Sequence, residues 1–375
     1  MMKVPDFISE ISENPDIIAN SKLLRGCYIM SILIQVSWVF AVAVLLTGLI
    51  KKIAPRFQLL DLPVQRSSHS KPTPVGGGLS IVLLFLLLAS QYFFAGLLSL
   101  AEYMAIAAAG FIAVLGLIDD LRHLDIRWRL PLQCVAAIWS VAWLGDVPAI
   151  DFGGVSLGSS WFLNGLAVLA LVWLLNLYNF MDGIDGIAVS EMLFVTLVAA
   201  LALNHSGDDV VALLSLTLFA SGAGFLLWNW PPAKIFMGDV GSGFIGFCLG
   251  LLALITMHHG SMTIWTWLLL LGVFIVDAMV TLARRFYNGE KWYEGHAAHA
   301  YQKAAKRYNS HAKVTITVLI INCLWLAPLA WLSVLRPELG LILSVIGFSP
   351  LLVLALKLEA GIPVKLAMSV DPESE

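Results

Sequence analysis

The sequence predicts an all-α polytopic membrane protein. Of its 375 residues, 59% are hydrophobic and only 13% are charged, and the mean hydropathy is +0.86. A soluble domain has roughly a quarter of its residues charged, so one large soluble core is excluded. Apolar runs of about 20 residues, long enough to cross a bilayer at 1.5 Å per residue, recur along almost the whole chain.

Eleven such runs predict about eleven transmembrane helices in a single domain, residues 28–357. The polar and acidic residues 1–27 form an N-terminal tail that lacks the basic start of a signal peptide. Residues 358–375 form a C-terminal tail. The predicted spans are 28–50, 76–98, 101–118, 130–145, 161–180, 184–203, 210–228, 240–258, 262–283, 313–334 and 338–357.

The lysines and arginines predict the orientation of these spans. Loops that follow odd-numbered spans, together with the C-terminal tail, hold 18 of the 22 basic residues. Because basic loops stay in the cytoplasm, we expect the N-terminus outside and the C-terminus in the cytoplasm. Loops on the outer face are short, and residues 146–160 read as a small hairpin there. The polar segments on the cytoplasmic face are 61–75, 119–129, 176–186, 229–239 and 284–312.

The charge, the cysteines and the absent motifs argue against a nucleic-acid partner, a cysteine metal site and several enzyme classes. The net charge of −3 gives no indication of a nucleic-acid partner. The four cysteines lie in or beside apolar runs without metal-ligand spacing, so they are interpreted as packing residues. P-loop, Rossmann, nucleophile-elbow and zinc-hydrolase motifs are absent from the sequence.

Asp119 and Asp120 end the third predicted span. Adjacent carboxylates repel, so near a low-dielectric boundary they need a metal, a cation or a shared proton. A solvated pair at a helix end is the alternative, but the dipole of a helix C-terminus disfavours anions. A functional pair is therefore favoured, and Arg122, Arg127 and Arg129 in the same loop are available for phosphates.

The segment from Asn176 to Gly186 carries two asparagines and two aspartates between two apolar runs. Hydrocarbon does not tolerate so many unpaired polar groups, so they must face water, a ligand or each other. Asp182 and Asp185 lie one turn apart if the segment is helical. Glu191, inside the next span, is left open between a structural partner and a site residue.

A third polar segment runs from Asn229 to Gly243. Asp239 is placed at the start of a predicted helix, where the dipole favours an anion, and Phe236 could stack on a base or simply pack. His296 and His299 have a spacing that metals use, although phosphate contact is the favoured role. Asp277 is expected to pair with one of the nearby arginines.

Together these residues resemble the polyprenyl-phosphate N-acetylhexosamine-1-phosphate transferases. The resemblance covers residues 66–313 and is closest to the O-antigen initiating enzymes that use FucNAc or QuiNAc. The motifs that carry it are Asp119-Asp120, Asn176-x-x-Asn179-x-x-Asp182-Gly-x-Asp185-Gly and Phe236-Met-Gly-Asp239-x-Gly-Ser.

The resemblance implies transfer of a sugar 1-phosphate from a UDP-N-acetylhexosamine to undecaprenyl phosphate, with release of UMP. It implies Mg²⁺ or Mn²⁺ as cofactor, a bacterial inner-membrane location with the site facing the cytoplasm, and membrane lipids as surroundings. A homodimer is left open. The catalytic and metal-binding residues would be Asp119, Asp120 and Asp239. The substrate-binding residues would be His69, Thr73, Arg127, Asn176, Asn179, Asp182, Asp185, Asn229, Phe236, His296 and His299.

The sugar, with FucNAc or QuiNAc ahead of GlcNAc, depends on side chains that the sequence does not place. The competing hypothesis is a transporter or flippase of a lipid-linked or nucleotide sugar. Such a protein would need ionisable groups near mid-membrane, for which Asp277 and Glu191 are the available residues.

Overall fold

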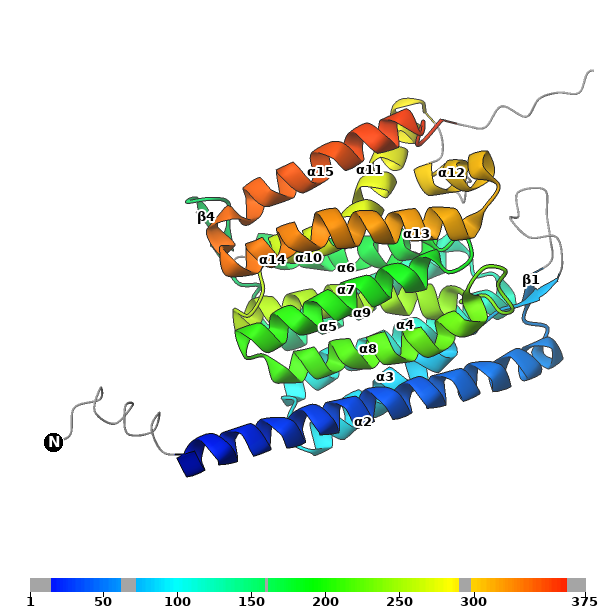
Figure 1. Ribbon diagram of the computed structural model, residues 1–375. Coiled ribbons are helices and arrows are strands. Elements are labelled where there is room, and N and C mark those ends of the chain that lie inside the picture. Colours follow the sequence, from blue (N-terminus) through cyan, green and yellow to red (C-terminus); the bar gives the residue numbers. More distant parts are fainter. Residues whose placement is uncertain (1–14, 62–71, 159–160, 290–297, 363–375) are drawn as a thin grey trace, which may run out of the picture.

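The computed structural model describes residues 15–61, 72–158, 161–289 and 298–362, which form a bundle of helices (Figure 1). Most of the helices run in roughly parallel or antiparallel directions. They are α2 (Pro15–Ile53), α3 (Leu79–Phe94), α4 (Leu100–Arg122), α5 (Ile126–Leu144), α6 (Trp161–Met181), α7 (Ile187–Ser206), α8 (Asp209–Asn229), α9 (Asp239–His259), α10 (Ile264–Leu270), α11 (Gly272–Tyr287), α12 (Ala300–Tyr308), α13 (His311–Ile321), α14 (Ala327–Leu335) and α15 (Gly340–Lys357).

The bundle has the exterior of a membrane protein. Large apolar side chains such as Leu45 and Leu324 stay about three-quarters exposed on the outer helices, 73% and 75% respectively. α9 lies at the centre, packed against α4 and α6, and almost all of its side chains are buried. Helices that are apolar on every face belong in a large core or in lipid, so the bundle is a polytopic membrane protein.

Each of the eleven predicted spans coincides with helix, although their number as membrane crossings stays a prediction. Within the described ranges, eight helices are long and apolar enough to cross a bilayer. The pair α10–α11 is bent by 80° at Leu271 and makes a ninth such segment only if it is taken as one broken span. The remaining two runs form α3, a shorter apolar helix of 16 residues, and α5, which begins with charged residues at the polar end of the bundle.

α2 begins at Pro15, so it extends back into the predicted polar tail. Near the other end of the chain, α13 and α14 are joined by a π-helical turn, Asn322–Leu326. Asn322 donates a hydrogen bond there to the buried carboxylate of Glu191 on α7. The structure thus gives Glu191 a structural partner.

Two small hairpins lie at opposite ends of the bundle (Figure 1). β1 (Leu60–Asp61) pairs with β2 (Thr73–Pro74), and β3 (Ile150–Asp151) pairs with β4 (Ser156–Leu157). The second pair confirms the hairpin predicted within 146–160. β1 and α12 share the end at which α4, α6, α8 and α11 finish and α5 and α9 begin, so the polar segments gather at one end.

Candidate active site

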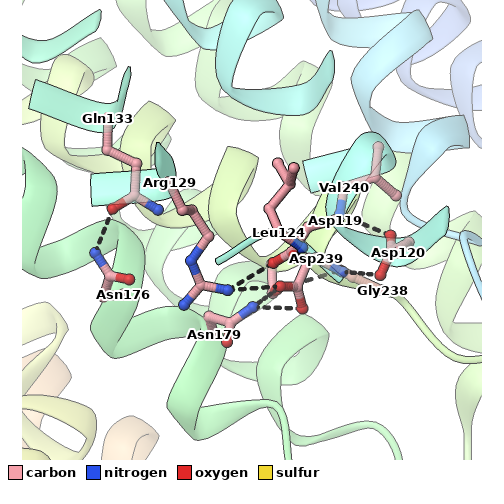
Figure 2. Close-up of polar contacts among 11 residues, drawn as sticks. Asp119, Asp120, Leu124, Arg129, Gln133, Asn176, Asn179, Gly238, Asp239 and Val240 are labelled. Carbon is pink, nitrogen blue, oxygen red and sulfur yellow. Dashed lines mark hydrogen bonds and ion pairs between the residues drawn. The ribbon is translucent and has the colours of Figure 1, made fainter. Parts of the chain in front are cut away.

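The end of α4 meets the beginning of α9 at Asp120. Its two carboxylate oxygens accept the backbone N–H groups of Asp239 (2.9 Å) and Val240 (3.1 Å) (Figure 2). A carboxylate is unfavourable at the C-terminus of its own helix but favourable at the N-terminus of another. The N–H groups at the start of α9 therefore stabilise the negative charge of Asp120, which the dipole of α4 alone would disfavour.

Close packing of the two backbones makes this contact possible. At Gly116, one turn before the pair, a Cβ atom would overlap the carbonyl oxygen of Asp239 and lie 2.6 Å from its carbonyl carbon. Gly238 precedes α9 with a φ of +79°, a conformation that favours glycine. Gly116 on α4 and Gly238 before α9 therefore allow Asp239 to lie against α4.

Asp119, the first member of the pair, is buried and points to Arg129 on α5. Arg129 Nη1 lies 2.6 Å from Asp119 Oδ2 and 3.2 Å from Asp239 Oδ2, so one guanidinium bridges two carboxylates. Leu124 N–H donates to the other oxygen of Asp119 at 2.6 Å. The two predicted carboxylates thus have different surroundings, and Asp119 is the one that belongs to the network around Arg129 (Figure 2).

Two asparagines of α6 complete this network. Asn179 Nδ2 donates to Asp239 Oδ1 (2.7 Å) and contacts Ser242 Oγ at 3.1 Å. Asn176, one turn earlier, donates to Gln133 Oε1 on α5 at 2.8 Å. Residues from α4, α5, α6 and α9 therefore meet at one place.

A small cavity of about 20 Å³, enough for one water molecule, opens between these side chains and the apolar floor of α4 and α6. Asp119, Arg129, Asn176, Asn179 and Asp239 supply its polar walls. Asp239 keeps 34% of its side chain exposed, compared with 8% for Asp119. Asp239 is therefore the more accessible carboxylate for a ligand that approaches from the polar end.

Asp182 joins the same cluster from the turn between α6 and α7. Burial, followed by the negative charges of Asp239, Asp185 and Asp120, raises the pKa of Asp182 well above its ordinary value. Asp185 faces the other way, where its Oδ2 accepts Ala233 N–H at 3.0 Å and lies 3.3 Å from His311 Nδ1. The two aspartates of the second motif therefore have different surroundings: Asp182 lies near the other carboxylates, and Asp185 is bound by Ala233 and His311.

Asn229 links this turn to the segment that leads into α9. Its Oδ1 accepts Gly186 N–H and its Nδ2 donates to the carbonyl of Ile235, both at 3.0 Å. β2 and the turn after it lie beside that segment, since Phe236 N–H donates to the carbonyl of Pro74 (2.8 Å) and Gly77 N–H donates to the carbonyl of Phe236 (2.9 Å). Asn229 is buried and Phe236 is half-buried.

The remaining predicted binding residues lie further from the carboxylates or outside the described ranges. Thr73 sits in β2, paired with Asp61, and the side chain of Arg127 is 88% exposed beside Asp125. His299 is buried at the start of α12, against Asp277 of α11 and near Phe180. His69 and His296 fall within 62–71 and 290–297, outside the described residues.

The donor chemistry of the cluster fits a hard divalent cation. Carboxylate oxygens are ligands that Mg²⁺ and Mn²⁺ prefer, and Asp119 and Asp239 bring such oxygens to the same guanidinium nitrogen. Arg129 bridges Asp119 and Asp239, whereas Asp120 accepts backbone N–H groups at the start of α9. Among the described residues, no set of three His, Cys, Asp or Glu side chains already converges with metal-ligand geometry. Arg129 occupies the space between the two carboxylates that would hold the ion.

Sequence reasoning missed Gln133, and it noted Arg129 as a basic residue of the loop and Ser242 as the end of the third motif without giving either a place in the site. Asp125 accepts the N–H of Arg127 as the cap of α5, and helical spacing from there places Arg129 and Gln133 on one face, four residues apart. That spacing could have favoured Arg129 over Arg127. Ser242 follows Asp239 by three residues, which would have placed both on one side of α9.

Comparison with known proteins agrees with this geometry. Residues 102–257 match the model of glycosyl transferase family 4. A probable undecaprenyl-phosphate N-acetylglucosaminyl 1-phosphate transferase of Bacillus subtilis is 30% identical over 74% of this chain and 78% of its own length. A decaprenyl-phosphate N-acetylglucosaminephosphotransferase of Mycolicibacterium smegmatis is 31% identical, with 73% and 75% covered.

An undecaprenyl-phosphate alpha-N-acetylglucosaminyl 1-phosphate transferase of Thermotoga maritima is 27% identical, over 77% of this chain and 89% of its own. The match to the family model runs from α4 to α9, the helices between which the carboxylate network lies. The chain belongs to the superfamily of polyprenyl-phosphate N-acetylhexosamine-1-phosphate transferases, within glycosyl transferase family 4.

Proposed function

We propose that this protein transfers an N-acetylhexosamine 1-phosphate from a UDP-sugar to undecaprenyl phosphate and releases UMP. The observation that carries the proposal is the network in which Arg129 bridges Asp119 and Asp239 while Asn179 holds the second oxygen of Asp239. Clustered carboxylates with one guanidinium at a membrane protein's polar end are suited to phosphoryl transfer between anionic substrates.

The proposed reaction is a direct displacement. An oxygen of the lipid phosphate attacks the phosphorus that bears the sugar, and the bond from that phosphorus to the oxygen of UMP breaks. UMP leaves with the electron pair of that bond. A phosphate monoester is already largely ionised near neutral pH, since its second pKa is about 6, so a general base has little proton to remove. Arg129 and the asparagines would then orient the phosphates rather than move protons.

Mg²⁺ or Mn²⁺ is the proposed cofactor, with Asp239 and Asp119 as ligands, and would neutralise the charge that develops on the leaving UMP. For this to happen, Arg129 must move from between the two carboxylates. A guanidinium displaced from them would be placed to bind a substrate phosphate in a bidentate manner. We assign Asp120 the separate task of holding the first turn of α9.

The polar end of the bundle is proposed to face the cytoplasm of a bacterium, with the protein in the inner membrane, the N-terminus outside and eleven crossings. The excess of lysine and arginine in the loops at this end supports that orientation. UDP-sugars are charged and stay in the cytoplasm, whereas the polyprenyl chain stays in lipid, so a site at this boundary reaches both substrates.

For the donor we propose UDP-FucNAc or UDP-QuiNAc ahead of UDP-GlcNAc, as the first step of O-antigen or related polysaccharide synthesis. The segment from Asn179 through Glu191 and the region around His299 support this choice by their resemblance to enzymes with those donors. A screen of UDP-GlcNAc, UDP-GalNAc, UDP-FucNAc and UDP-QuiNAc with the purified protein would identify the donor by the UMP released.

The decisive experiment measures UMP release from undecaprenyl phosphate and UDP-N-acetylhexosamine, with and without Mg²⁺. Wild-type protein is expected to release UMP only with a divalent cation, and Asp239→Asn is expected to lose this activity. Asp146→Asn is the matched control, because Asp146 accepts a hydrogen bond from Asn164 at the opposite end of the bundle. UMP release that survives in Asp239→Asn would refute the metal role, and substrate uptake into proteoliposomes without UMP would favour a transporter.

A further inference from the structure

Asp277 on α11 is buried, with only 5% of the residue exposed, and its carboxylate accepts four hydrogen bonds. Thr281 Oγ1 donates from the next turn of the same helix (3.2 Å), and His299 Nδ1 lies 3.3 Å away. Ala300 N–H donates to Oδ1 (2.9 Å), and Tyr301 N–H donates to Oδ2 (3.0 Å). The sequence predicted an arginine as the partner of Asp277, whereas these contacts bind the carboxylate to the beginning of α12.

These hydrogen bonds anchor α12, a short helix at the polar end of the bundle, on α11. A buried carboxylate needs donors, and the N-terminus of a helix supplies both free N–H groups and a favourable dipole. The nine residues of α12 have too few apolar side chains to hold the helix in place unaided. α11, which carries Asp277, is bent by 80° relative to α10.

Tyr301 carries the contact from α12 to the second motif. Its side chain is buried, and its hydroxyl donates to the carbonyl of Phe180 at 2.8 Å and accepts the N–H of Gly183. These two peptide groups lie on either side of Asp182. A Cβ at Gly183 would overlap the Tyr301 hydroxyl and lie 2.7 Å from Gln302 Nε2, so glycine is required for this approach.

The same peptide segment contains Asn179, which holds Asp239. A displacement of Tyr301 would therefore move the backbone that carries both Asn179 and Asp182, although Tyr301 itself does not contact the carboxylates of the network. His299 packs with its ring near Phe180, with 6.5 Å between ring centroids, and reinforces the same surface.

We propose that Asp277 and Tyr301 are positioning residues that hold the Asn179–Asp182 turn in place for the UDP part of the donor. The proposal rests on the function proposed above and adds two residues to it. Asp277 fixes the start of α12, and Tyr301 transmits that position to the peptide groups on both sides of Asp182.

The test compares Asp277→Asn, Tyr301→Phe and the double variant in the full-length protein. We expect each single variant to raise KM for the UDP-sugar about tenfold, with a smaller fall in kcat because Asn179 also holds Asp239. KM for undecaprenyl phosphate should stay unchanged, and binding of UDP measured by calorimetry should weaken as KM rises. Because both residues act through one contact chain, the double variant should be no worse than the weaker-binding single variant.

Asp208→Asn is the matched control, because Asp208 accepts His259 Nδ1 and Ser261 Oγ at the opposite end of the bundle. It should lower the thermal midpoint without changing KM. The proposal is overturned if the Asp277 and Tyr301 variants also change only the thermal midpoint. Tyr301→Phe removes a single oxygen, so it decides the question even where Asp277→Asn fails to fold.

Failure of the proposed function would look different. Wild-type protein that neither binds UDP nor releases UMP would remove both proposals together. Wild-type protein that does both, with the Asp277 and Tyr301 variants unchanged in KM, would overturn only this inference.

Discussion

Asp120 accepts the backbone N–H of Asp239 at 2.9 Å, although the two residues are 119 positions apart in the sequence. The contact sets the C-terminal end of α4 against the N-terminal end of α9, the most buried helix of the bundle. It also separates two adjacent carboxylates by role, because Asp119 faces Arg129 while Asp120 faces main-chain donors.

This separation predicts opposite effects of two neighbouring substitutions. Asp120→Asn keeps one acceptor oxygen and directs an amide NH₂ at a backbone N–H, so we expect the free energy of unfolding to fall by about 1–3 kcal/mol. Asp119→Asn can still accept Leu124 N–H but loses its charge toward Arg129. We expect its UMP release to fall about 10²- to 10³-fold with a smaller change in thermal midpoint. A larger midpoint loss in Asp119→Asn would contradict the assignment.

Arg129 is predicted to be essential because it is the cation that bridges two carboxylates. In Arg129→Gln, Asp119 and Asp239 would repel each other without that cation, and the substrate phosphates would lose a bidentate donor. We expect UMP release to fall about 10²- to 10³-fold. Arg129→Lys should recover part of the activity, since an ammonium supplies the charge without the planar fork.

The control for this pair of variants is Arg336→Gln. Arg336 forms an exposed ion pair with Glu338 (3.6 Å) at the other end of the bundle, so its loss should leave the rate of UMP release unchanged. Arg129→Gln protein with wild-type kcat/KM for both substrates would show that the bridge has no part in the reaction.

Much of this architecture could be predicted from the sequence, because apolar runs determine where membrane helices form. The convergence of Asp119, Asn179 and Asp239 could also be predicted, since all three end or begin such runs at one end of the bundle. Periodicity does not reveal contacts to main-chain atoms, so the bond from Asp120 to the N-terminus of α9 was not visible.

Asp277 and Arg129 show a second limit. An acidic residue seven positions before an arginine suggests an ion pair on one helix, but the structure gives Asp277 the N-terminus of α12, 23 and 24 residues away. Arg127 and Arg129 have the same chemistry in the same segment. Only the position of α5 beside α4 directs Arg129 inward and leaves Arg127 in solvent.

Gly116 is predicted to be the most sensitive glycine near the site. A Cβ there would lie 2.6 Å from the carbonyl carbon of Asp239 and 2.7 Å from Val240 N, where backbone atoms cannot give way cheaply. We expect Gly116→Ala to push α9 from α4, to lower the thermal midpoint and to lower UMP release at least about tenfold, by the cost of overpacking. Gly165→Ala on α6 is the control, because its Cβ would meet no atom within 4 Å. Equal activities of the two variants would refute the close contact.

Asp182 should make the stability of the protein depend on pH. Its pKa is raised by burial and by neighbouring carboxylates, so the native state keeps a proton that the unfolded chain has released. The unfolded state therefore binds fewer protons between the ordinary value of 3.8 and the raised pKa, and the free energy of unfolding falls as pH rises through that window. Below pH 3.8 this contribution disappears, because both states are protonated.

Asp182→Asn removes the ionisable group and with it this penalty. We expect the thermal midpoint of the variant, followed in detergent from pH 5 to pH 8, to fall less with rising pH than that of the wild type. The gap between the two curves should therefore widen toward high pH. Parallel curves would show that Asp182 releases its proton equally in both states, and a gap that narrows would mean that its charge is stabilised by the fold. A divalent cation held by Asp119 and Asp239 would favour the charged carboxylate of the nearby Asp182, so adding Mg²⁺ should flatten the wild-type curve more than the curve of the variant.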